Sequence, residues 1–195
     1  MFMLSCVFAA GLGAISLAAA TSAAATGGVD WQQHLAHELP HLGHRNWIVV
    51  ADSAYPLQSG EGIETVATGA EQITVLKAVL AQLKQSKHVR PVVYLDAELP
   101  FVSEDDAPGI AAYRNELKTL LKDRTANSLP HEEIIDKLDS SAEKFHVLIL
   151  KTNMTLPYTS VFIELDCGYW SAEAEARLRS AMKRAIRTEN LRASE

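Results

Sequence analysis

The feature that most constrains the fold is a short apolar run, residues 47–51, which contains no charged side chain and ends at Asp52. A run of β-type apolar residues without alternation is typical of a strand covered on both faces. Such strands occur in sheets that carry helices on both sides. The run therefore predicts an α/β fold in which residues 46–52 form a buried strand.

Helical and strand-like apolar spacing alternates along the rest of the chain. We expect five helices: one capped by Asp30, one over 70–85, one from the polar turn 104–109 to about Lys122, one opened by Pro130 and one capped by Ser171. We expect four further strands, at 63–66, 91–95, 145–150 and 161–165. A short loop joins the last two strands, which favours at least one antiparallel pair. The sequence therefore predicts a layered α/β domain with a mixed sheet.

Size and charge limit the classes of function. The chain has 195 residues and a formal net charge of −6, which fits one domain that is stable by its core. A mildly acidic chain has no electrostatic reason to bind nucleic acid or anionic lipid. Basic residues gather between Arg177 and Arg192, but glutamates are interleaved with them, which indicates a solvated helix face.

Residues 1–26 differ from the rest of the chain, because no charge precedes Asp30 and the segment ends in an alanine-rich run. An apolar stretch that ends in small residues is typical of a secretory signal peptide. The basic region that normally opens a signal peptide is missing, since no Lys or Arg precedes Arg45, so a misplaced start codon stays open. A membrane anchor and a cytosolic location remain as alternatives to a cleaved signal. We expect export to the periplasm or the medium, with residues 27–170 as the main domain and 171–195 as a helical extension. Cleavage would leave Cys167 alone, so we expect no internal disulfide.

Four histidines lie at positions i, i+3, i+7 and i+10: His34, His37, His41 and His44. On an unbroken helix they would share one face, as metal ligands do. Pro40 and Gly43 are expected to break this helix, and Glu38 is expected to point away from the stripe. We interpret the stripe as a polar helix face or an oligomer contact, with metal binding as the alternative.

His44 and Asp52 stand at the two ends of the buried strand. A histidine titrates near neutral pH, and a buried carboxylate costs several kcal/mol unless it is hydrogen-bonded. Ligands favour the position just past the carboxyl end of a strand in α/β sheets. A structural role for His44 and a turn-capping role for Asp52 remain open. About 20 Å of extended strand, at ~3.3 Å per residue, separates them, so one site needs a bent strand or a neighbouring subunit to use both.

Later polar residues also fall at expected element ends. His131 follows Pro130 at a helix start, where the helix dipole favours neutral imidazole; simple exposure is the alternative. Lys151 ends one strand, and Tyr158 and Ser160 precede the next. Tyr158 either packs in its loop or hydrogen-bonds and stacks on a sugar.

Several well-known motifs are missing from the sequence. Gly60, Gly62 and Gly69 do not form a dinucleotide fingerprint, because no strand leads directly into them and no helix follows at the required place. The sequence also contains no G-x-S-x-G nucleophile elbow. We expect neither a cofactor nor a metal ion.

Two segments resemble one known family, the D-ribose pyranase / L-fucose mutarotase family. Gly43-His44 followed by Ile48 to Pro56 is similar to the family's opening motif, a Gly-His pair, a strand and an Asp-Ala/Ser-x-aromatic-Pro turn. The segment 157–163 resembles its Pro-Tyr-x-Asn segment before the last strand. Lys151 stands where the family often has a basic residue, and His131 occupies the place of its second histidine. The resemblance covers roughly residues 30–170.

The resemblance implies a three-layer α/β/α fold with a mixed sheet, and ring-shaped homo-oligomers of the pentamer or decamer type with sites near subunit boundaries. It implies a mutarotase that acts on a free monosaccharide without a cofactor. His44 would be the acid/base catalyst. The residues that would bind the sugar are Asp52, His131, Lys151, Tyr158 and Ser160.

Three departures from the family pattern affect this reading. Ser160 replaces the Asn, which shortens the reach and removes two amide donors. Asn153-Met154 replaces the usual Gly-Glu, and the leader and the charged C-terminal helix are additional. A sugar-binding protein without turnover is therefore an alternative function. A structural or metal-binding oligomer that uses the histidine stripe 34–44 is another.

Overall fold

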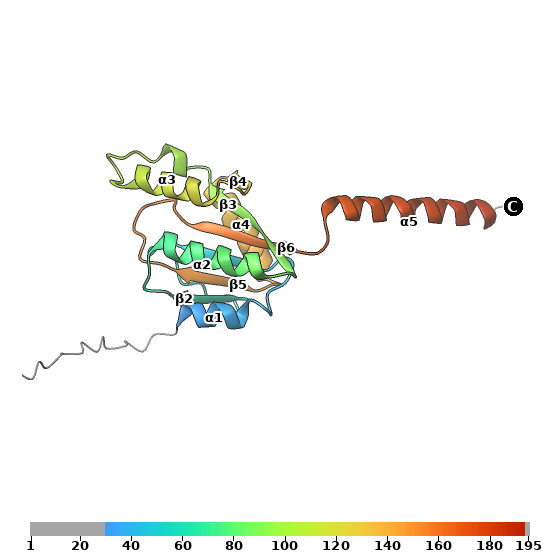
Figure 1. Ribbon diagram of the computed structural model, residues 1–195, viewed down its shortest axis with the longest axis horizontal. Helices are drawn as coiled ribbons and strands as arrows, with labels where there is room; N and C mark the ends of the chain where they lie inside the picture. The colour runs from blue at the N-terminus through green and yellow to red at the C-terminus, as the bar shows by residue number, and fades with distance from the viewer. Residues whose placement is uncertain (1–29, 194–195) are drawn as a thin grey trace, which may run out of the picture.

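A six-stranded mixed sheet lies at the centre of the part of the chain that the computed structural model describes, residues 30–193 (Figure 1). The strand order is β2-β5-β1-β6-β3-β4. The strands are β1 (Trp47–Ala51), β2 (Ile63–Ala67), β3 (Val89–Asp96), β4 (Ala126–Leu129), β5 (Val147–Lys151) and β6 (Val161–Cys167). β6 is antiparallel to both of its neighbours, β1 and β3, whereas the other neighbouring pairs are parallel.

Helices cover both faces of this sheet (Figure 1). One face carries α1 (Trp31–Glu38), α2 (Gln72–Gln85) and α3 (Ile110–Leu120), with a short 3-10 turn, η1, at Leu99–Phe101. The other face carries α4 (His131–Ala142). The three-layer α/β/α fold with a mixed sheet, expected from the sequence, is therefore confirmed.

The two faces of β1 contribute to two separate hydrophobic cores. All five residues of β1 are buried. Ile48 and Val50 pack in the core beneath α1, α2 and α3. Trp47 and Val49 pack in the core beneath α4. The run lacks the alternation of a half-exposed strand because both of its faces are covered.

Two details of the sheet differ from the sequence-based expectation. β4 was not expected, because its four residues include the exposed polar Asn127 and Ser128 at the edge of the sheet and carry no apolar pattern. β5 and β6 are joined by a short loop but are not neighbours, because β1 lies between them. The antiparallel pairs are instead formed by β6 with β1 and β3.

The last helix, α5 (Ala172–Ala193), extends away from the layered body (Figure 1). Ser171 caps its first turn as expected, because its Oγ accepts the N–H of Ala174 at 3.1 Å. Leu178, Met182 and Ile186 are exposed on this helix. In the described part of the chain, no helix combines the length and the apolar character that crossing a membrane requires. The predicted signal peptide at residues 1–26 lies outside the described residues.

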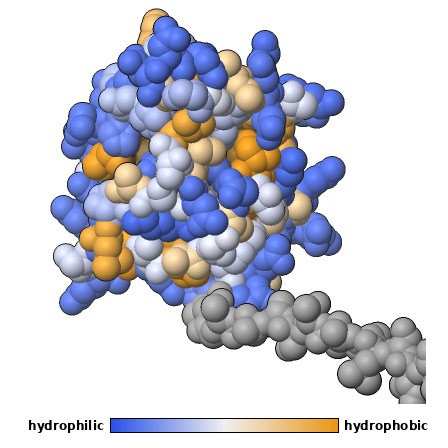
Figure 2. All heavy atoms as spheres, turned by 90° about the vertical axis from the view of Figure 1, so that its left-hand side faces the viewer, coloured by the Kyte–Doolittle hydropathy of each residue, from blue (hydrophilic) through white to orange (hydrophobic). Residues whose placement is uncertain are grey.

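The molecular surface is largely hydrophilic on the face that Figure 2 presents. Hydrophobic side chains there form small groups separated by hydrophilic ones. Scattered apolar residues of this kind are normal on soluble proteins and need no partner.

Candidate functional site

Several polar side chains meet at one end of the sheet because β6 runs against its neighbours. Val161, the first residue of β6, pairs with Val50 near the end of β1 and with Leu95 near the end of β3. The residue before β6 therefore lies beside the residues that end β1 and β3. This arrangement brings Ser160 and Asp52 together and places Asp96 at the same edge.

Ser160 fixes the carboxylate of Asp52. Its Oγ donates a hydrogen bond to Asp52 Oδ2 at 2.8 Å and accepts the Asp52 backbone N–H at 3.1 Å. The other carboxylate oxygen of Asp52 accepts the N–H of Ala54 at 2.9 Å, which caps the turn. Ser160 is only 2% exposed. Its hydroxyl therefore orients Asp52 and does not face the pocket described below.

His131 forms a hydrogen bond with a carboxylate that the sequence reasoning did not single out, Asp96. The His131 Nδ1 lies 3.0 Å from Asp96 Oδ1, and the side chain of Asp96 is fully buried. Burial raises the pKa of Asp96 above its usual value, and the hydrogen bond with His131 opposes this rise. When Asp96 is ionised, the imidazole proton lies on Nδ1, and Nε2 is left as a proton acceptor.

The start of α4 holds His131 in place. Both carboxylate oxygens of Glu98 accept the His131 backbone N–H at 3.1 Å. A carboxylate at this position satisfies an otherwise unpaired N–H of the first turn and interacts favourably with the helix dipole. The ring of His131 also packs edge-on against Phe162, with 6.3 Å between the ring centroids. The imidazole is therefore fixed by contacts on several sides.

A pocket of about 450 Å³ opens beside these groups. It is lined by the turn after β1, the first residues of α4 and the loop before β6, including Asp52, Tyr55, His131 and Tyr158. Tyr158 has a positive φ of 56° and is 41% exposed, and its ring stands nearly perpendicular to that of His131 at 5.9 Å between centroids. The volume falls within the ~300–1,000 Å³ range of small-molecule sites.

A larger hollow of about 890 Å³ lies between residues 57–63 and the end of α4. Its lining includes Asp139 on α4 and His146 in the loop before β5. We assign the candidate site to the smaller pocket because its imidazole, His131, is hydrogen-bonded to the buried carboxylate of Asp96. In the larger hollow, Asp139 contacts Gln58 and His146 contacts Glu64. Volume alone does not identify the place where chemistry occurs.

Lys151 and Gln72 hold the loops around the pocket. Lys151 Nζ donates to the carbonyl oxygen of Tyr55 at 2.7 Å, which fixes the turn after β1. The amide of Gln72 is buried and donates to the carbonyl oxygens of Val50 at 2.9 Å and Thr159 at 2.7 Å. Gln72 thereby joins the end of β1 to the loop that carries Tyr158.

The sequence reasoning missed Asp96, Glu98 and Gln72. Asp96 had a detectable signal, because it ends an apolar run just as Asp52 does. Glu98 and Gln72 had no such signal, since their partners come from distant parts of the chain: a backbone N–H for Glu98, and two backbone carbonyls and the Thr152 hydroxyl for Gln72.

His44 lies at the opposite end of the sheet from the pocket. It precedes β1, whereas Asp52 follows it, and its side chain is 55% exposed. Its Nε2 is 3.4 Å from Asp166 Oδ1, and the same aspartate forms an ion pair with Arg90. One chain therefore brings Asp52, His131 and Tyr158 to one pocket and keeps His44 away from it.

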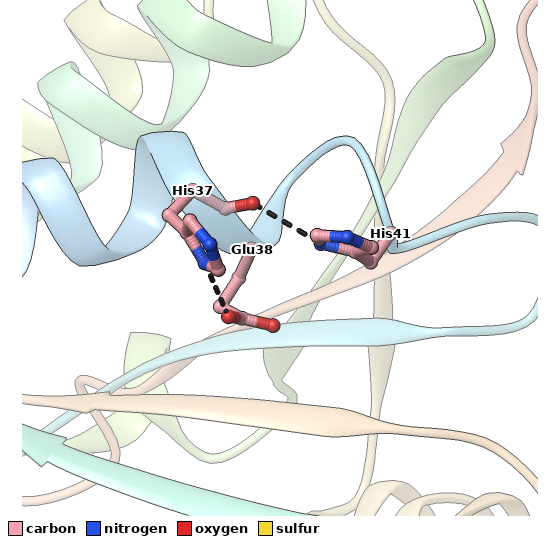
Figure 3. Close-up of side chains that lie close together, drawn as sticks. All are labelled: His37, Glu38 and His41. Carbon is pink, nitrogen blue, oxygen red and sulfur yellow. Dashed lines mark hydrogen bonds and ion pairs between the residues drawn. The ribbon is translucent and has the colours of Figure 1, made fainter.

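The histidine stripe divides into separate contacts. His34 Nε2 lies 2.8 Å from Glu64 Oε1 on β2. His37, Glu38 and His41 form a second group at the end of α1 (Figure 3). The expectation that Glu38 points away from the stripe is wrong, because its Oε1 lies 2.9 Å from His37 Nδ1. The helix ends at Glu38, before Pro40, which was expected to break it, but the Glu38 side chain turns back toward the histidine.

The fold and the pocket define the class of protein: a three-layer α/β protein with an imidazole–carboxylate pair at one end of a mixed sheet. The chain belongs to the RbsD / FucU transport protein family, because the model of that family matches residues 31–168. The resemblance expected from the sequence is therefore confirmed.

Solved structures of similar fold include proteins of this family. The structure of RbsD from Bacillus subtilis complexed with D-ribose is 22% identical, with 71% of this chain and 93% of that chain covered and a TM-score of 0.48. The fucose mutarotase from Streptococcus pneumoniae in complex with L-fucose is 22% identical, with coverages of 67% and 89% and a TM-score of 0.45. FucU from Bifidobacterium longum is 18% identical, with coverages of 68% and 92% and a TM-score of 0.45. A comparison with curated protein sequences finds no match.

Proposed function

We propose that this protein is a monosaccharide mutarotase or pyranase-like isomerase that interconverts ring forms of a free aldose. The observation that carries the proposal is the His131–Asp96 pair beside a pocket that also presents Asp52 and Tyr158. Membership of the RbsD / FucU family supports the same class of substrate, since two structures of this fold contain D-ribose and L-fucose.

The chemistry requires only proton transfer. A base accepts the proton of the anomeric hydroxyl while an acid protonates the ring oxygen, and the bond between the anomeric carbon and the ring oxygen breaks. The open aldehyde then recloses on its other face or through another hydroxyl, with the same protons returned. General acid–base catalysis of this kind contributes about 10²–10⁴-fold.

The residues of the pocket suit these steps. With Asp96 ionised, the Nε2 of His131 accepts a proton or a sugar hydroxyl. The carboxylate of Asp52 accepts hydrogen bonds from sugar hydroxyls, and the exposed ring of Tyr158 offers a stacking surface. We propose that His44 of a neighbouring protomer supplies the second acid/base group. The family resemblance implies an acid/base role for His44 and sites near subunit boundaries. This would require the ring-shaped homo-oligomer expected from the sequence.

The test is anomer exchange measured by magnetisation-transfer NMR across a panel of aldoses that includes ribose and fucose. We expect faster exchange with the wild-type protein and a loss of about 10²-fold or more with His131→Gln or His44→Ala. His34→Gln is the matched control, because this histidine on α1 contacts Glu64 and lies outside the pocket. Exchange at the uncatalysed rate with every sugar would contradict the proposal.

A sugar-binding protein without turnover is the second candidate. The Ser160 hydroxyl is engaged by Asp52, and Met154 occupies the position where the family pattern has a loop acid. Saturation-transfer NMR separates the two candidates. Binding of ribose or fucose without faster exchange would favour this second function.

We also propose that the protein is exported, with cleavage near residue 26. The support is the sequence of residues 1–26, which is apolar, uncharged and alanine-rich at its end. The N-terminal sequence of the protein recovered from its host tests this. A recovered protein that still begins at Met1 would contradict cleavage and would favour a membrane anchor or a cytosolic location.

A further inference from the structure

A compact group of three potential metal ligands lies at the end of α1, apart from the sugar pocket. His37, Glu38 and His41 each contribute one ligating atom, and these atoms all lie within 4.8 Å of one another (Figure 3). In the sequence the group reads His-Glu-Leu-Pro-His, which matches the H-E-x-x-H pattern of two histidines on either side of a glutamate. The pattern alone is weak evidence for a metal site, and the geometry of the three side chains is the stronger evidence.

The hydrogen bonds of the group leave ligating atoms available. His41 Nδ1 lies 3.2 Å from the carbonyl oxygen of His37. A carbonyl only accepts, so Nδ1 carries the proton and the lone pair of Nε2 is left for a cation. An imidazole that donates its other N–H to a carbonyl oxygen is the usual arrangement of a metal-binding histidine. The carboxylate of Glu38 lies 2.9 Å from His37 Nδ1 and supplies the negative charge.

The backbone that carries His41 is held firmly although the imidazole is exposed. The His41 N–H donates to the Glu38 carbonyl oxygen at 2.8 Å. Leu39 and Leu42 on either side are buried, at 6% and 2% exposure. The Nε2 of His88 donates to both of their carbonyl oxygens, at 3.2 and 3.1 Å. The turn after α1 is therefore preorganised, and only side-chain rotation is needed to close a site.

We propose that His37, Glu38 and His41 bind one divalent transition-metal ion of the zinc class. Zinc takes imidazole and carboxylate ligands at about 2.0–2.2 Å with tetrahedral geometry, which places ligating atoms about 3.4 Å apart. The ligating atoms lie within 4.8 Å of one another, so side-chain rotations that move them by about 1–1.5 Å reach this spacing. Two imidazoles with one carboxylate favour zinc, nickel or copper over magnesium or calcium. Water fills the remaining coordination position.

The site differs from the H-E-x-x-H helix of metalloproteases. There the helix continues through both histidines, and the glutamate serves as a general base rather than a ligand. Here α1 ends at Glu38, and the following turn brings His41 and the Glu38 carboxylate into one group. Glu38 is therefore assigned as a ligand, and the proposal is metal binding without peptide hydrolysis.

Isothermal titration of the tag-free chain with zinc chloride tests the proposal directly. We expect saturable binding of one ion per chain at this site. His41→Ala and His37→Ala are each expected to weaken binding by about tenfold or more. Titration with cobalt(II) should give the intense visible absorption of a tetrahedral site, which neither variant should show. All three side chains lie at the surface, so circular dichroism is expected to show folded variants.

The controls separate this site from other ligands. His44→Gln removes a nearby histidine that contacts Asp166 instead of the group, and zinc affinity should be unchanged. Glu38→Gln keeps the size of the side chain but removes its charge, and it should weaken zinc binding. Wild-type affinity in the Glu38→Gln variant, or the absence of saturable zinc binding to the wild-type chain, would overturn the proposal. Neither result depends on sugar turnover.

Discussion

The orientation of the His131 imidazole depends on one buried carboxylate. Asp96 lies at the end of β3, is 2% exposed and contacts His131 Nδ1, while its second oxygen is buried without a hydrogen-bond partner. Burial disfavours the charged form of Asp96, whereas the hydrogen bond with His131 favours it. The carboxylate thus fixes the imidazole at a cost to the stability of the fold.

That cost gives Asp96 a predictable effect on stability. The pKa of Asp96 is raised in the folded protein, so between its unfolded and folded values the folded state binds more protons. The contribution of Asp96 to the wild-type free energy of unfolding therefore falls as pH rises through this window. Asp96→Asn removes the effect. We expect its free energy of unfolding, relative to wild type, to increase from about pH 3 toward neutral pH, as measured by urea unfolding. If the difference in unfolding free energy between Asp96→Asn and wild type does not change with pH, the raised pKa of Asp96 is contradicted.

Ser160 is the second residue whose effect can be predicted. Ser160→Ala removes both the acceptor of the Asp52 N–H and a donor to the Asp52 carboxylate. We expect a loss of about 1–3 kcal/mol in the free energy of unfolding, because these groups become unsatisfied near the interior. The control is Ser53→Ala, an exposed neighbour expected to change stability by less than about 0.5 kcal/mol. Equal effects of the two substitutions in urea unfolding would show that the Ser160 contact is unimportant.

At the scale of elements, the approach of β2 to the end of α4 depends on one glycine. A Cβ at Gly62 would collide with the carbonyl oxygens of Ala142 and Phe145. Both are backbone atoms, so α4 and β2 would have to move apart. Gly62→Ala is therefore expected to cost about 1–3 kcal/mol, as overpacking does. Gly43→Ala is the matched control, because its Cβ would have its nearest neighbour at 3.9 Å. Thermal melts that shift equally for both variants would contradict this.

The apolar patterns in the sequence predicted most of the helices and strands. They failed where contacts between distant parts of the chain determine the structure. β1 was predictable because it is an unbroken apolar run that is buried on both faces, and α2 was predictable because its apolar residues recur at helical spacing. β4 was not, since a short edge strand with exposed Asn127 and Ser128 has no period to detect. The loop between β5 and β6 suggested a hairpin, but loop length does not reveal that β1 lies between them.

At the scale of the whole molecule, the site was predictable only in part. Asp52 follows the end of β1 and His131 begins α4, and the topology brings them to one pocket with Tyr158. Ser160 and Lys151 were expected to bind substrate, yet in the structure their side chains contact Asp52 and the Tyr55 carbonyl oxygen. Sequence order shows that a residue ends a strand, but it does not show whether the side chain reaches a ligand or another side chain.

The position of His44 leads to a prediction about assembly. His44 and His131 lie at opposite ends of the sheet in one chain, so a shared site requires contact between two protomers. His44→Ala and His131→Gln proteins, each inactive alone, should then regain activity when co-expressed. When the two variants assemble at random, about a quarter of the shared sites receive both an intact His44 and an intact His131. We therefore expect about a quarter of the wild-type rate of anomer exchange. Mixing that restores no activity, although mixed oligomers form, would mean that the two histidines do not act in one site.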